Sequence, residues 1–528
     1  MPQTPASLIL SEITFRLPHG PAVLDGVSFG LGPGRHALIG ANGTGKSTLL
    51  KIVAGLLRPD SGAVRAHGEL GYLPQDPAAA PDRPVAALLG VQATMRALAA
   101  IEAGSVREQD FETVGDDWDL PERLDAHLSR LGLSGLALDR PAGTLSGGEL
   151  TLLSLTALLL RRPAVLLLDE PTNNLDRAAR HRLYDAVAAF AGTLLVVSHD
   201  RELLDLVDDI GELRGGTVRW YGGGFTHYRE TVAAEQEAAA QAVASARNGV
   251  RRQKRELAEQ QTKQARRDKQ GRTQAESLPP ILAGTRKRRA QESAGRLRAV
   301  HRQRLDSARE TLDEAETRLR EDDVIRIDLP GTEVPGRREV LRAAGLRAPH
   351  GTAWQERRLD LSVRGPERIA LTGPNGIGKT SLLRCLAGET EPAEGSAEVL
   401  VPMRYLPQRL DLLDPDANVI DNVRRFAPGA DPGAIHHRLA RFLLRGEAVR
   451  RPAGTLSGGE RWRATLACLL LAEPAPQLLV LDEPTNNLDL AGVRHLTEAL
   501  AAFRGALLVV SHDQRFLDDL GPGRRIEL

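Results

Sequence analysis

The 528-residue chain has no long apolar segment and almost no cysteine. Its longest apolar runs, residues 152–160 and 164–168, fall well short of the roughly 20 residues that span a bilayer. Two cysteines, Cys385 and Cys468, cannot form a disulfide framework and do not have zinc-site spacing. The first residues lack the charged and apolar regions of a signal peptide. These absences predict a cytoplasmic protein with no membrane segment of its own.

A net charge of one sign is missing as well, because 69 basic residues balance 69 acidic ones. The chain as a whole is therefore no electrostatic match for nucleic acid, and any basic surface must be local. Lysine is scarce, at seven of the 69 basic residues, as a GC-rich genome would produce. It is nevertheless present in both glycine-rich loops, where a compact, flexible ammonium suits phosphate better than a planar guanidinium.

What the chain does have is one set of six motifs that occurs twice. The first set is GANGTGKS (Gly40–Ser47), LPQ ending at Gln75, LSGGE (Leu145–Glu149), LLLDEP (Leu166–Pro171), NNLD (Asn173–Asp176) and SHD (Ser198–Asp200). The second is GPNGIGKT (Gly373–Thr380), LPQ ending at Gln408, LSGGE (Leu456–Glu460), LVLDEP (Leu479–Pro484), NNLD (Asn486–Asp489) and SHD (Ser511–Asp513). The repeat and the length predict two α/β domains and an additional element between them.

Each glycine-rich loop follows a strand-like run and leads into a helical pattern, which is the context of a P-loop. Backbone N–H groups and the helix N-terminus would hold the phosphates of ATP, and the lysine would reach the β- and γ-phosphates. The nucleotide-binding residues predicted from the first loop are Gly40, Asn42, Gly43, Gly45, Lys46, Ser47 and Thr48. Those predicted from the second are Gly373, Asn375, Gly376, Gly378, Lys379, Thr380 and Ser381.

A carboxylate ends each of two aliphatic runs of the kind found in buried central strands of parallel sheets. Ligands bind at the carboxyl ends of such strands, so these carboxylates are expected to hold Mg²⁺ with the P-loop hydroxyls and the LPQ glutamines. The predicted metal ligands are Ser47, Gln75 and Asp169 in the first half, and Thr380, Gln408 and Asp482 in the second.

The predicted catalytic residues are two glutamates and two histidines. Glu170 and Glu483 directly follow the metal-binding aspartates and are placed to orient and deprotonate the attacking water. His199 and His512 each follow their glutamate by 29 residues and come after an apolar run. This matched spacing favours a role in sensing the γ-phosphate over a structural one.

LSGGE together with DEPTNNLD and SHD resembles the ATP-binding cassette (ABC) ATPases over nearly all of both halves. The resemblance implies a monomer whose halves close head to tail, with each ATP between the P-loop of one half and LSGGE of the other. It adds Ser457, Gly458 and Gly459 to the Lys46 site, and Ser146, Gly147 and Gly148 to the Lys379 site. ATP would close the halves and hydrolysis would release them.

The two copies differ at a few positions. The family has Arg where the second copy has Arg463, and Leu152 replaces it in the first, which puts equal behaviour of the two sites in doubt. Phe15 is a candidate to stack on the adenine of the first site. Leu346 takes that position in the second half, so no aromatic stack is predicted there.

Between the halves, the pattern predicts a helix over 228–269, a loop over 270–285 and a second helix over 286–321. A coiled-coil seam is expected at Leu305, Ala308, Leu312, Ala315 and Leu319. Residues 232–304 carry 18 basic side chains against 7 acidic ones. The surplus includes a run at Arg286–Arg289, which suggests contact with a phosphate backbone, RNA more than DNA.

Two cassettes in one chain joined by a charged helical hairpin resemble the ABC-F proteins, whose linker reaches into the ribosome near the P-site tRNA. The fold expected is α/β, with two P-loop ABC-type nucleotide-binding domains (1–228 and 324–528) joined by a long α-helical hairpin linker (229–323). The resemblance implies an ATPase that binds the ribosome through the linker, near Arg286–Arg289. It would act in antibiotic resistance by ribosomal protection or as a translation factor.

Two other classes stay open on the sequence alone. Fused cassettes could serve as the soluble ATPase subunit of a membrane exporter, although such a motor has no need of a long hairpin. A DNA-repair ATPase would favour a metal hook at the tip of its coiled coil, and the linker contains no cysteine pair. The interval from LPQ to LSGGE is 71 residues in the first half and 49 in the second, so an inserted arm would be short.

Overall fold

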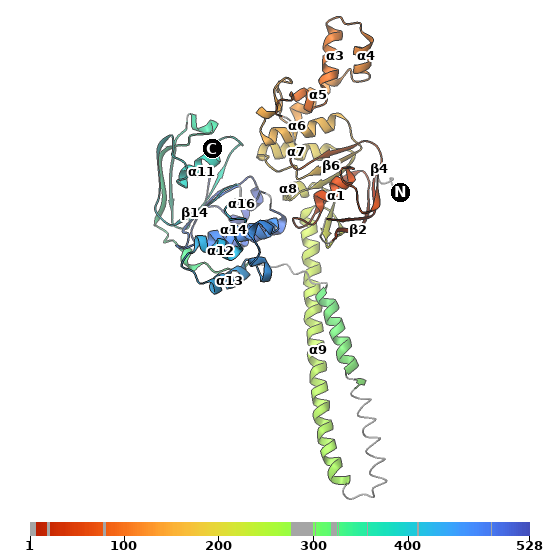
Figure 1. The fold of residues 1–528 in the computed structure, drawn as a ribbon, viewed down its shortest axis with the longest axis vertical. Helices are drawn as coiled ribbons and strands as arrows, with labels where there is room; N and C mark the ends of the chain where they lie inside the picture. Colours follow the sequence, from red (N-terminus) through yellow and green to blue (C-terminus); the bar gives the residue numbers. More distant parts are fainter. Residues whose placement is uncertain are drawn as a thin grey trace. The chain divides into compact units, whose positions relative to one another are not determined.

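The computed structural model describes residues 7–17, 22–77, 81–275, 299–300, 302–317, 325, 327–355, 357–408, 411–486 and 488–528. The chain forms two compact units. Met1–Phe225 and Val324–Leu528 make up the first unit, which contains both α/β halves, and Thr226–Asp323 make up the second. Figure 1 shows the elements of each unit in sequence colours.

A six-stranded sheet forms the centre of the first half. Its strand order is β5 (Leu70–Leu73), β6 (Val165–Asp169), β7 (Thr193–Val197), β3 (Gly34–Ile39), β8 (Asp209–Arg214) and β9 (Thr217–Gly222). The first five strands are parallel, and β9 returns antiparallel to β8 after Gly215 and Gly216, both at positive φ. Every residue of β6 and β7 is buried, as expected for central parallel strands.

The second half repeats this arrangement in five parallel strands. Their order is β14 (Met403–Leu406), β15 (Leu478–Asp482), β16 (Ala506–Val510), β12 (Arg368–Thr372) and β17 (Arg524–Glu527). The central strands β15 and β16 are again buried throughout. The predicted α/β fold with two P-loop domains is confirmed.

A three-stranded antiparallel sheet accompanies each parallel sheet. The strands are β2 (Ala22–Leu31), β1 (Leu8–Arg16) and β4 (Ser61–Ala66) in the first half, and β11 (Leu359–Arg364), β10 (Glu339–Arg347) and β13 (Glu394–Val399) in the second. Leu8 and Leu10 of β1 share one hydrophobic core with Leu49 and Leu50 of the P-loop helix α1 (Lys46–Val53) and with the parallel sheet. The antiparallel sheet therefore fixes this helix against the parallel one.

Further helices connect and cover the sheets. They are α6 (Gly147–Leu160), α7 (Arg177–Ala189) and α8 (Arg201–Leu204) in the first half, and α11 (Lys379–Leu386), α14 (Gly458–Leu470), α15 (Leu490–Ala502) and α16 (Gln514–Leu520) in the second. Short 3₁₀ helices lie at Ala142–Thr144, Pro330–Thr332, Thr352–Gln355, Gly446–Val449 and Ala453–Thr455.

Between the LPQ and LSGGE motifs, each half carries a small helical region. The first has α2 (Val85–Leu88), α3 (Gln92–Glu102), α4 (Glu108–Val114) and α5 (Leu120–Arg130), and the second has α12 (Val419–Phe426) and α13 (Pro432–Arg441). In the first half, α3 and α4 lie side by side and pack through Ala97, Leu98 and Val114 (Figure 1). These two helices fall within the longer interval of the first half.

The second unit is helical, as predicted. Helix α9 (Phe225–Ala275) has 51 residues, about 75 Å at 1.5 Å per residue, and residues 299–300 and 302–317 are also helical. The predicted loop at 270–285 is wrong for residues 270–275, because a glycine weakens a helix without ending it and the first proline comes at 279. The run Arg286–Arg289 lies outside the described residues.

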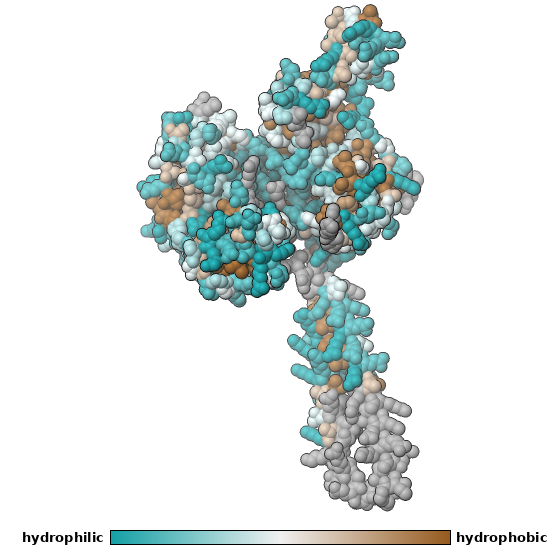
Figure 2. Space-filling view, viewed as in Figure 1, coloured by the Kyte–Doolittle hydropathy of each residue, from teal (hydrophilic) through white to brown (hydrophobic). Residues whose placement is uncertain are grey.

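The predicted seam is confirmed at two of its positions. Leu305 and Ala315 are buried, Ala308 and Leu312 are half-buried, and Leu319 lies outside the described residues. Within this unit, Arg247 of α9 pairs with Glu316 across 2.8 Å. Most of the remaining surface that is drawn in colour on these helices in Figure 2 is hydrophilic. Among the described residues, no helix has the length and apolarity needed to cross a membrane.

Candidate functional site

The predicted motifs meet at one edge of each parallel sheet. In the first half, β3 leads into the glycine-rich loop, β6 ends at Asp169 with Glu170 next, and β7 is followed by the SHD motif with His199. Strands β12, β15 and β16 repeat this in the second half. Because parallel strands end at the same edge, residues more than a hundred positions apart come together there.

Glycine is required where each loop turns into its helix. Gly45 and Gly378 precede α1 and α11 with φ of 103° and 105°, in the left-handed region. A Cβ on Gly45 would lie 2.5 Å from Val23 Cγ1, and one on Gly378 would collide with Trp354, whose Nε1 donates to Gly378 O at 3.1 Å. A left-handed residue before a helix N-terminus is a backbone geometry that binds anions.

Both P-loop lysines are buried and folded over their own loop. Lys46 Nζ donates to Gly40 O at 2.7 Å and to Ala41 O at 3.1 Å. Lys379 Nζ makes the equivalent bonds to Gly373 O and Pro374 O at 2.8 and 3.0 Å. Burial lowers the pKa of both lysines, and nearby carboxylates, Glu170 and Glu483 foremost, oppose this. The loop carbonyls thus hold the ammonium groups where phosphate would be bound.

A hydroxyl and a carboxylate lie beside each lysine. Ser47 Oγ donates to Asp169 Oδ1 at 3.0 Å, and Tyr72 OH lies 3.4 Å from Asp169 Oδ2. In the second half, Tyr405 OH lies 3.4 Å from Asp482 Oδ2. Burial raises the pKa of both aspartates. Ser47 and Asp169 thus offer two adjacent oxygen atoms, the ligand type that Mg²⁺ prefers.

Each predicted glutamate faces its predicted histidine. His199 Nε2 lies 3.2 Å from Glu170 Oε1, and His512 Nε2 lies 3.3 Å from Glu483 Oε1. Both glutamates have a φ of 48°, rare for a residue with a side chain, and their N–H groups donate to Val197 O and Val510 O. The neighbouring strand therefore holds each glutamate in a backbone conformation that places it beside the histidine.

Burial dominates the protonation of these pairs. It raises the pKa of Glu170 to about 8 and that of Glu483 to about 7. The charge of Lys46 opposes the rise at Glu170, and those of Lys379 and Arg180 oppose it at Glu483. Burial also lowers the pKa of His199 and His512 to about 3, so both are neutral at pH 7. A carboxyl group with a pKa near 7 is well matched to general base catalysis.

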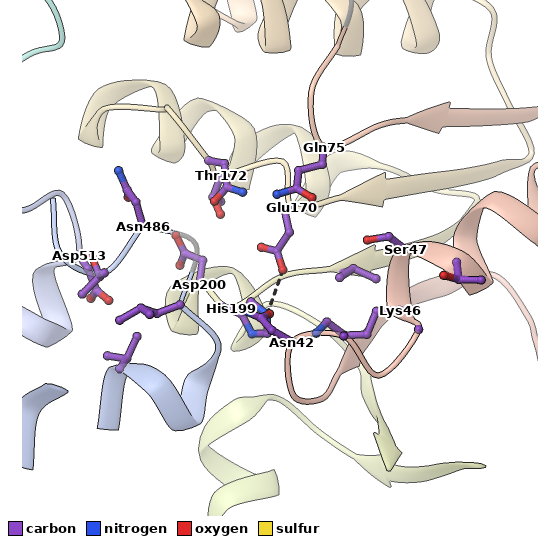
Figure 3. A pocket seen from close by; sticks show the side chains of 18 of the residues that line it. Asn42, Lys46, Ser47, Gln75, Glu170, Thr172, His199, Asp200, Asn486 and Asp513 are labelled. Atoms are coloured by element: carbon purple, nitrogen blue, oxygen red, sulfur yellow. Dashed lines mark ion pairs between the residues drawn. The ribbon is translucent and has the colours of Figure 1, made fainter. Parts of the chain in front are cut away.

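A cavity of about 480 Å³ opens at the first site, and residues of both halves line it (Figure 3). The first half contributes Lys46, Ser47, Gln75, Glu170 and His199, which brings the predicted P-loop, metal and catalytic residues together. The second half contributes Thr485, Asn486, Leu488, Val493 and Asp513. The volume is in the range of small-molecule sites.

Some predicted residues lie elsewhere. Ser146 and Ser457 each cap their own helix, in capping boxes with Glu149 and Glu460. Ser457 is not among the residues that line the cavity, so the predicted sandwich with Lys46 stays a prediction. The same holds for adenine stacking by Phe15, which packs against the hydrophobic core, whereas Leu17 lines the cavity. Gln75 and Gln408 are both exposed, and Gln75 lines the cavity.

The NNLD aspartates join the halves, a role that the sequence did not suggest. Asp489 caps α15 through Oδ1, which accepts from Gly492 N at 2.7 Å, and its Oδ2 accepts from the P-loop N–H of Asn42 at 2.7 Å. Asp176 does the same, with Ala179 N at 2.9 Å and Asn375 N at 3.2 Å. Each aspartate thus ties the start of its own helix to the P-loop of the other half.

Replacing Asp489 by Ala is expected to lower both stability and ATP turnover. The loss of the cap costs about 1 kcal/mol, and the N–H of Asn42 loses its acceptor in the other half. Thermal unfolding and phosphate release measure the two effects. Asp431→Ala is the matched control, because Asp431 caps α13 in the same way, through Ala434 N at 3.0 Å. If both variants slow turnover equally, the contact with the P-loop has no special role.

Other residues at the sites also went unnoticed in the sequence. Tyr72 and Tyr405 occupy the same place in the repeated Tyr-Leu-Pro-Gln segment, so the repeat itself was a usable signal. Arg180 approaches both sites, but the equivalent position in the second half is Val493, so the repeat could not reveal it. A search of the described residues finds no cluster of three or more His, Cys, Asp or Glu side chains suited to a metal.

Comparison with known proteins places both halves in one family. The family model described as ABC transporter matches residues 24–173 and 357–486. The tylosin resistance ATP-binding protein TlrC of Streptomyces fradiae is 36% identical over 523 residues, which cover 93% of this chain and 92% of TlrC. The energy-dependent translational throttle protein EttA of Mycobacterium tuberculosis is 32% identical, covering 97% of this chain and 90% of EttA.

Among solved structures, an RNase-L Inhibitor matches with a TM-score of 0.58 and 21% identity, over 97% of this chain and 86% of that protein. This likeness supports the fold of two P-loop domains in one chain. The family match in both halves and the near full-length relatives support a closer assignment. The chain belongs to the ATP-binding cassette family and, within it, to the ABC-F subfamily.

Proposed function

We propose that this protein is an ATPase that binds the ribosome and acts there through its interdomain linker. Its role would be antibiotic resistance by ribosomal protection or control of translation. The observation that carries the proposal is the match to a tylosin resistance protein over 93% of the chain, across both cassettes and the helices between them. Similarity to a translational throttle protein over 97% of the chain supports the same class.

Domains of the ABC family bind and hydrolyse ATP, and the residues at each site suggest how this protein does so. Lys46 and Lys379 would exchange their loop carbonyls for the β- and γ-phosphates, with the P-loop N–H groups around them. Glu170 and Glu483 would orient and deprotonate the water, and the neutral His199 and His512 would hold each carboxylate in place.

Mg²⁺ would be held by Ser47, Asp169 and Gln75 at the first site, and by Thr380, Asp482 and Gln408 at the second. The 3.0 Å separation of Ser47 Oγ and Asp169 Oδ1 fits such a pair of ligands. When bound, the ion supplies positive charge to the phosphate oxygens. The Ser47 and Tyr72 hydroxyls both contact the Asp169 carboxylate and would orient it for the ion.

Closure would bring Ser457, Gly458 and Gly459 to the Lys46 site, and Ser146, Gly147 and Gly148 to the Lys379 site. The capped N-termini of α14 and α6 carry the partial positive charge that suits a γ-phosphate. We infer an intramolecular closure in a cytoplasmic monomer of three parts, residues 1–228, 229–323 and 324–528. The basic run Arg286–Arg289 is the proposed contact with ribosomal RNA near the P-site tRNA.

Co-sedimentation with ribosomes tests the proposal. Glu170→Gln with Glu483→Gln should trap the ATP-bound state, and this variant is expected to pellet with purified ribosomes in ATP but not in ADP. The control is the same variant with Lys46→Ala and Lys379→Ala added, which should stay in the supernatant. A trapped variant that binds ATP yet never pellets with ribosomes would overturn the proposal, and recovery with membranes would favour an exporter subunit.

Neutralising the basic run tests the site of contact. Exchange of Arg286, Lys287, Arg288 and Arg289 for Gln is expected to weaken co-sedimentation and to reduce its dependence on salt, because fewer counterions are released on binding. The matched control exchanges Arg251, Arg302, Arg304 and Arg309, which are exposed cations on the described helices of the same unit, for Gln. An unchanged salt dependence in the first variant would contradict phosphate contact by Arg286–Arg289.

A further inference from the structure

One arginine, Arg180, lies where the SHD motifs of the two halves come together. It belongs to α7, the helix that follows the first NNLD motif, and its side chain is 14% exposed. Its Nη1 donates to Asp200 Oδ2 at 3.2 Å and its Nε to Leu175 O at 3.2 Å. Tyr184 OH donates to the same Asp200 oxygen at 2.7 Å. These bonds hold the guanidinium in one place on the first half.

From that place Arg180 lines a recess that also contains His512 of the second site. This small recess is lined by Arg180, Tyr184 and Asp200 from the first half and by His512 and Asp513 from the second. Arg180 also lines the larger cavity, where Asp200 and Asp513 both appear among the lining side chains (Figure 3). Its positive charge acts on Glu483, His512 and Asp513. A residue of the first half thus contributes to the electrostatics of the second glutamate–histidine pair.

The first site has no such cation at the corresponding position. Arg180 lies four residues after Asp176, and Val493 lies four residues after Asp489. Val493 is buried and lines the cavity that holds Glu170 and His199. Tyr184 corresponds in the same way to Thr497, whose hydroxyl donates to Val493 O at 3.0 Å within its own helix. The pseudo-symmetry is therefore broken where each half meets the site of the other.

We propose that Arg180 is a positioning residue for the second ATP site, supplied by the first half, and that it makes the two sites unequal in turnover. A fixed cation in the recess beside His512 stabilises negative charge on the phosphate as the bond to the leaving group breaks. Asp200 and Tyr184 hold it there in advance, so it needs no rearrangement during the reaction. This inference rests on the proposed hydrolysis at both sites.

Single-site variants separate the two turnover rates. With Glu170→Gln only the second site turns over, and with Glu483→Gln only the first does. In the first background, Arg180→Gln is expected to lower kcat about tenfold while KM changes less than about twofold. In the second background, the same change should lower kcat by clearly less, because Arg180 lines the first cavity but its charge acts on the glutamate–histidine pair of the second site. Arg180→Lys, which keeps the charge, should restore most of the second-site rate.

Arg182→Gln is the matched control, because Arg182 is a cation of the same helix that lines neither the recess nor the larger cavity. It should leave both rates unchanged. The proposal fails if Arg180→Gln slows both sites alike or only the first, or if Arg180→Lys slows the second site as much as Arg180→Gln does. If neither the Glu170→Gln protein nor the Glu483→Gln protein releases phosphate while Arg180 is intact, the result contradicts the proposed function instead.

A reciprocal variant keeps the test independent of the stability of Arg180→Gln. Val493→Arg introduces a cation into the cavity of the first site and is expected to narrow the ratio of the two single-site kcat values. Thermal unfolding of each variant shows whether it is folded at the assay temperature. A folded Val493→Arg protein with an unchanged ratio would overturn the proposal.

Discussion

Glu170→Gln together with Glu483→Gln is expected to slow ATP hydrolysis by about 10²–10⁴-fold, the range that general base catalysis contributes. Each amide would keep the size and burial of the carboxyl but could not accept a proton. ATP binding should survive, because the P-loop lysines and N–H groups are untouched. Phosphate release and binding of a fluorescent ATP analogue measure the two properties separately.

The matched control for this loss is Glu122→Gln in the first half. Glu122 is exposed on α5 and lines neither the cavity nor the recess. We expect that variant to hydrolyse ATP at the wild-type rate. If the double variant still released phosphate at that rate, the attacking water would have to be activated by a group other than these glutamates.

The position of these glutamates was predictable because the signals that set it are local. An aliphatic run that ends in Asp-Glu predicts a buried strand, and the duplicated spacing to SHD ties each histidine to its glutamate. Parallel strands then bring Glu170 and His199 to one edge, where 3.2 Å separates their side chains. Their positive φ could not be predicted, since it depends on the hydrogen bond from Glu170 N to Val197 O.

Contacts between the halves could not be predicted from the sequence, for a different reason. Asp489 and Asn42 are 447 positions apart, and nothing near either residue indicates the other. The NNLD motif was recognised, but its aspartate has the appearance of an ordinary helix cap, which it also is. Arg180 could not be recognised by comparing the two repeats, because Val493 takes the equivalent position in the second half.

The linker illustrates the limit of composition-based boundaries. Alternating alanine, glutamate and arginine correctly predicted a long helix, but glycine at 271 suggested an end that α9 passes by four residues. In a helix of 51 residues, one glycine costs about 1 kcal/mol, which does not break the hydrogen-bond ladder around it.

Without nucleotide, the same double variant is expected to be more stable than the wild type at pH 8.5, with the gap closing towards pH 5. Burial raises the pKa of Glu170 to about 8 and that of Glu483 to about 7, from 4.5 in the unfolded chain. Between pH 4.5 and about 8, these carboxyl groups are ionised in the unfolded chain but stay protonated in the folded one. The free energy of unfolding of the wild type therefore falls as pH rises, until pH passes about 8. The two raised pKa values together lower the free energy of unfolding by on the order of several kcal/mol, and glutamine, which does not ionise, removes this loss.

The histidines act in the opposite direction and so do not account for the gap. The pKa of His199 and His512 falls to about 3 on folding. Their contribution to the free energy of unfolding is therefore fully present above pH 6.5 and is lost as pH falls towards 3, in both proteins. Thermal midpoints without nucleotide or Mg²⁺, at half-unit steps from pH 5 to 8.5, measure the difference. Glu447→Gln, at a side chain that is 83% exposed, is the control. A gap that stays constant with pH would mean that Glu170 and Glu483 are ionised at neutral pH in the nucleotide-free protein, and so already act as bases before ATP arrives.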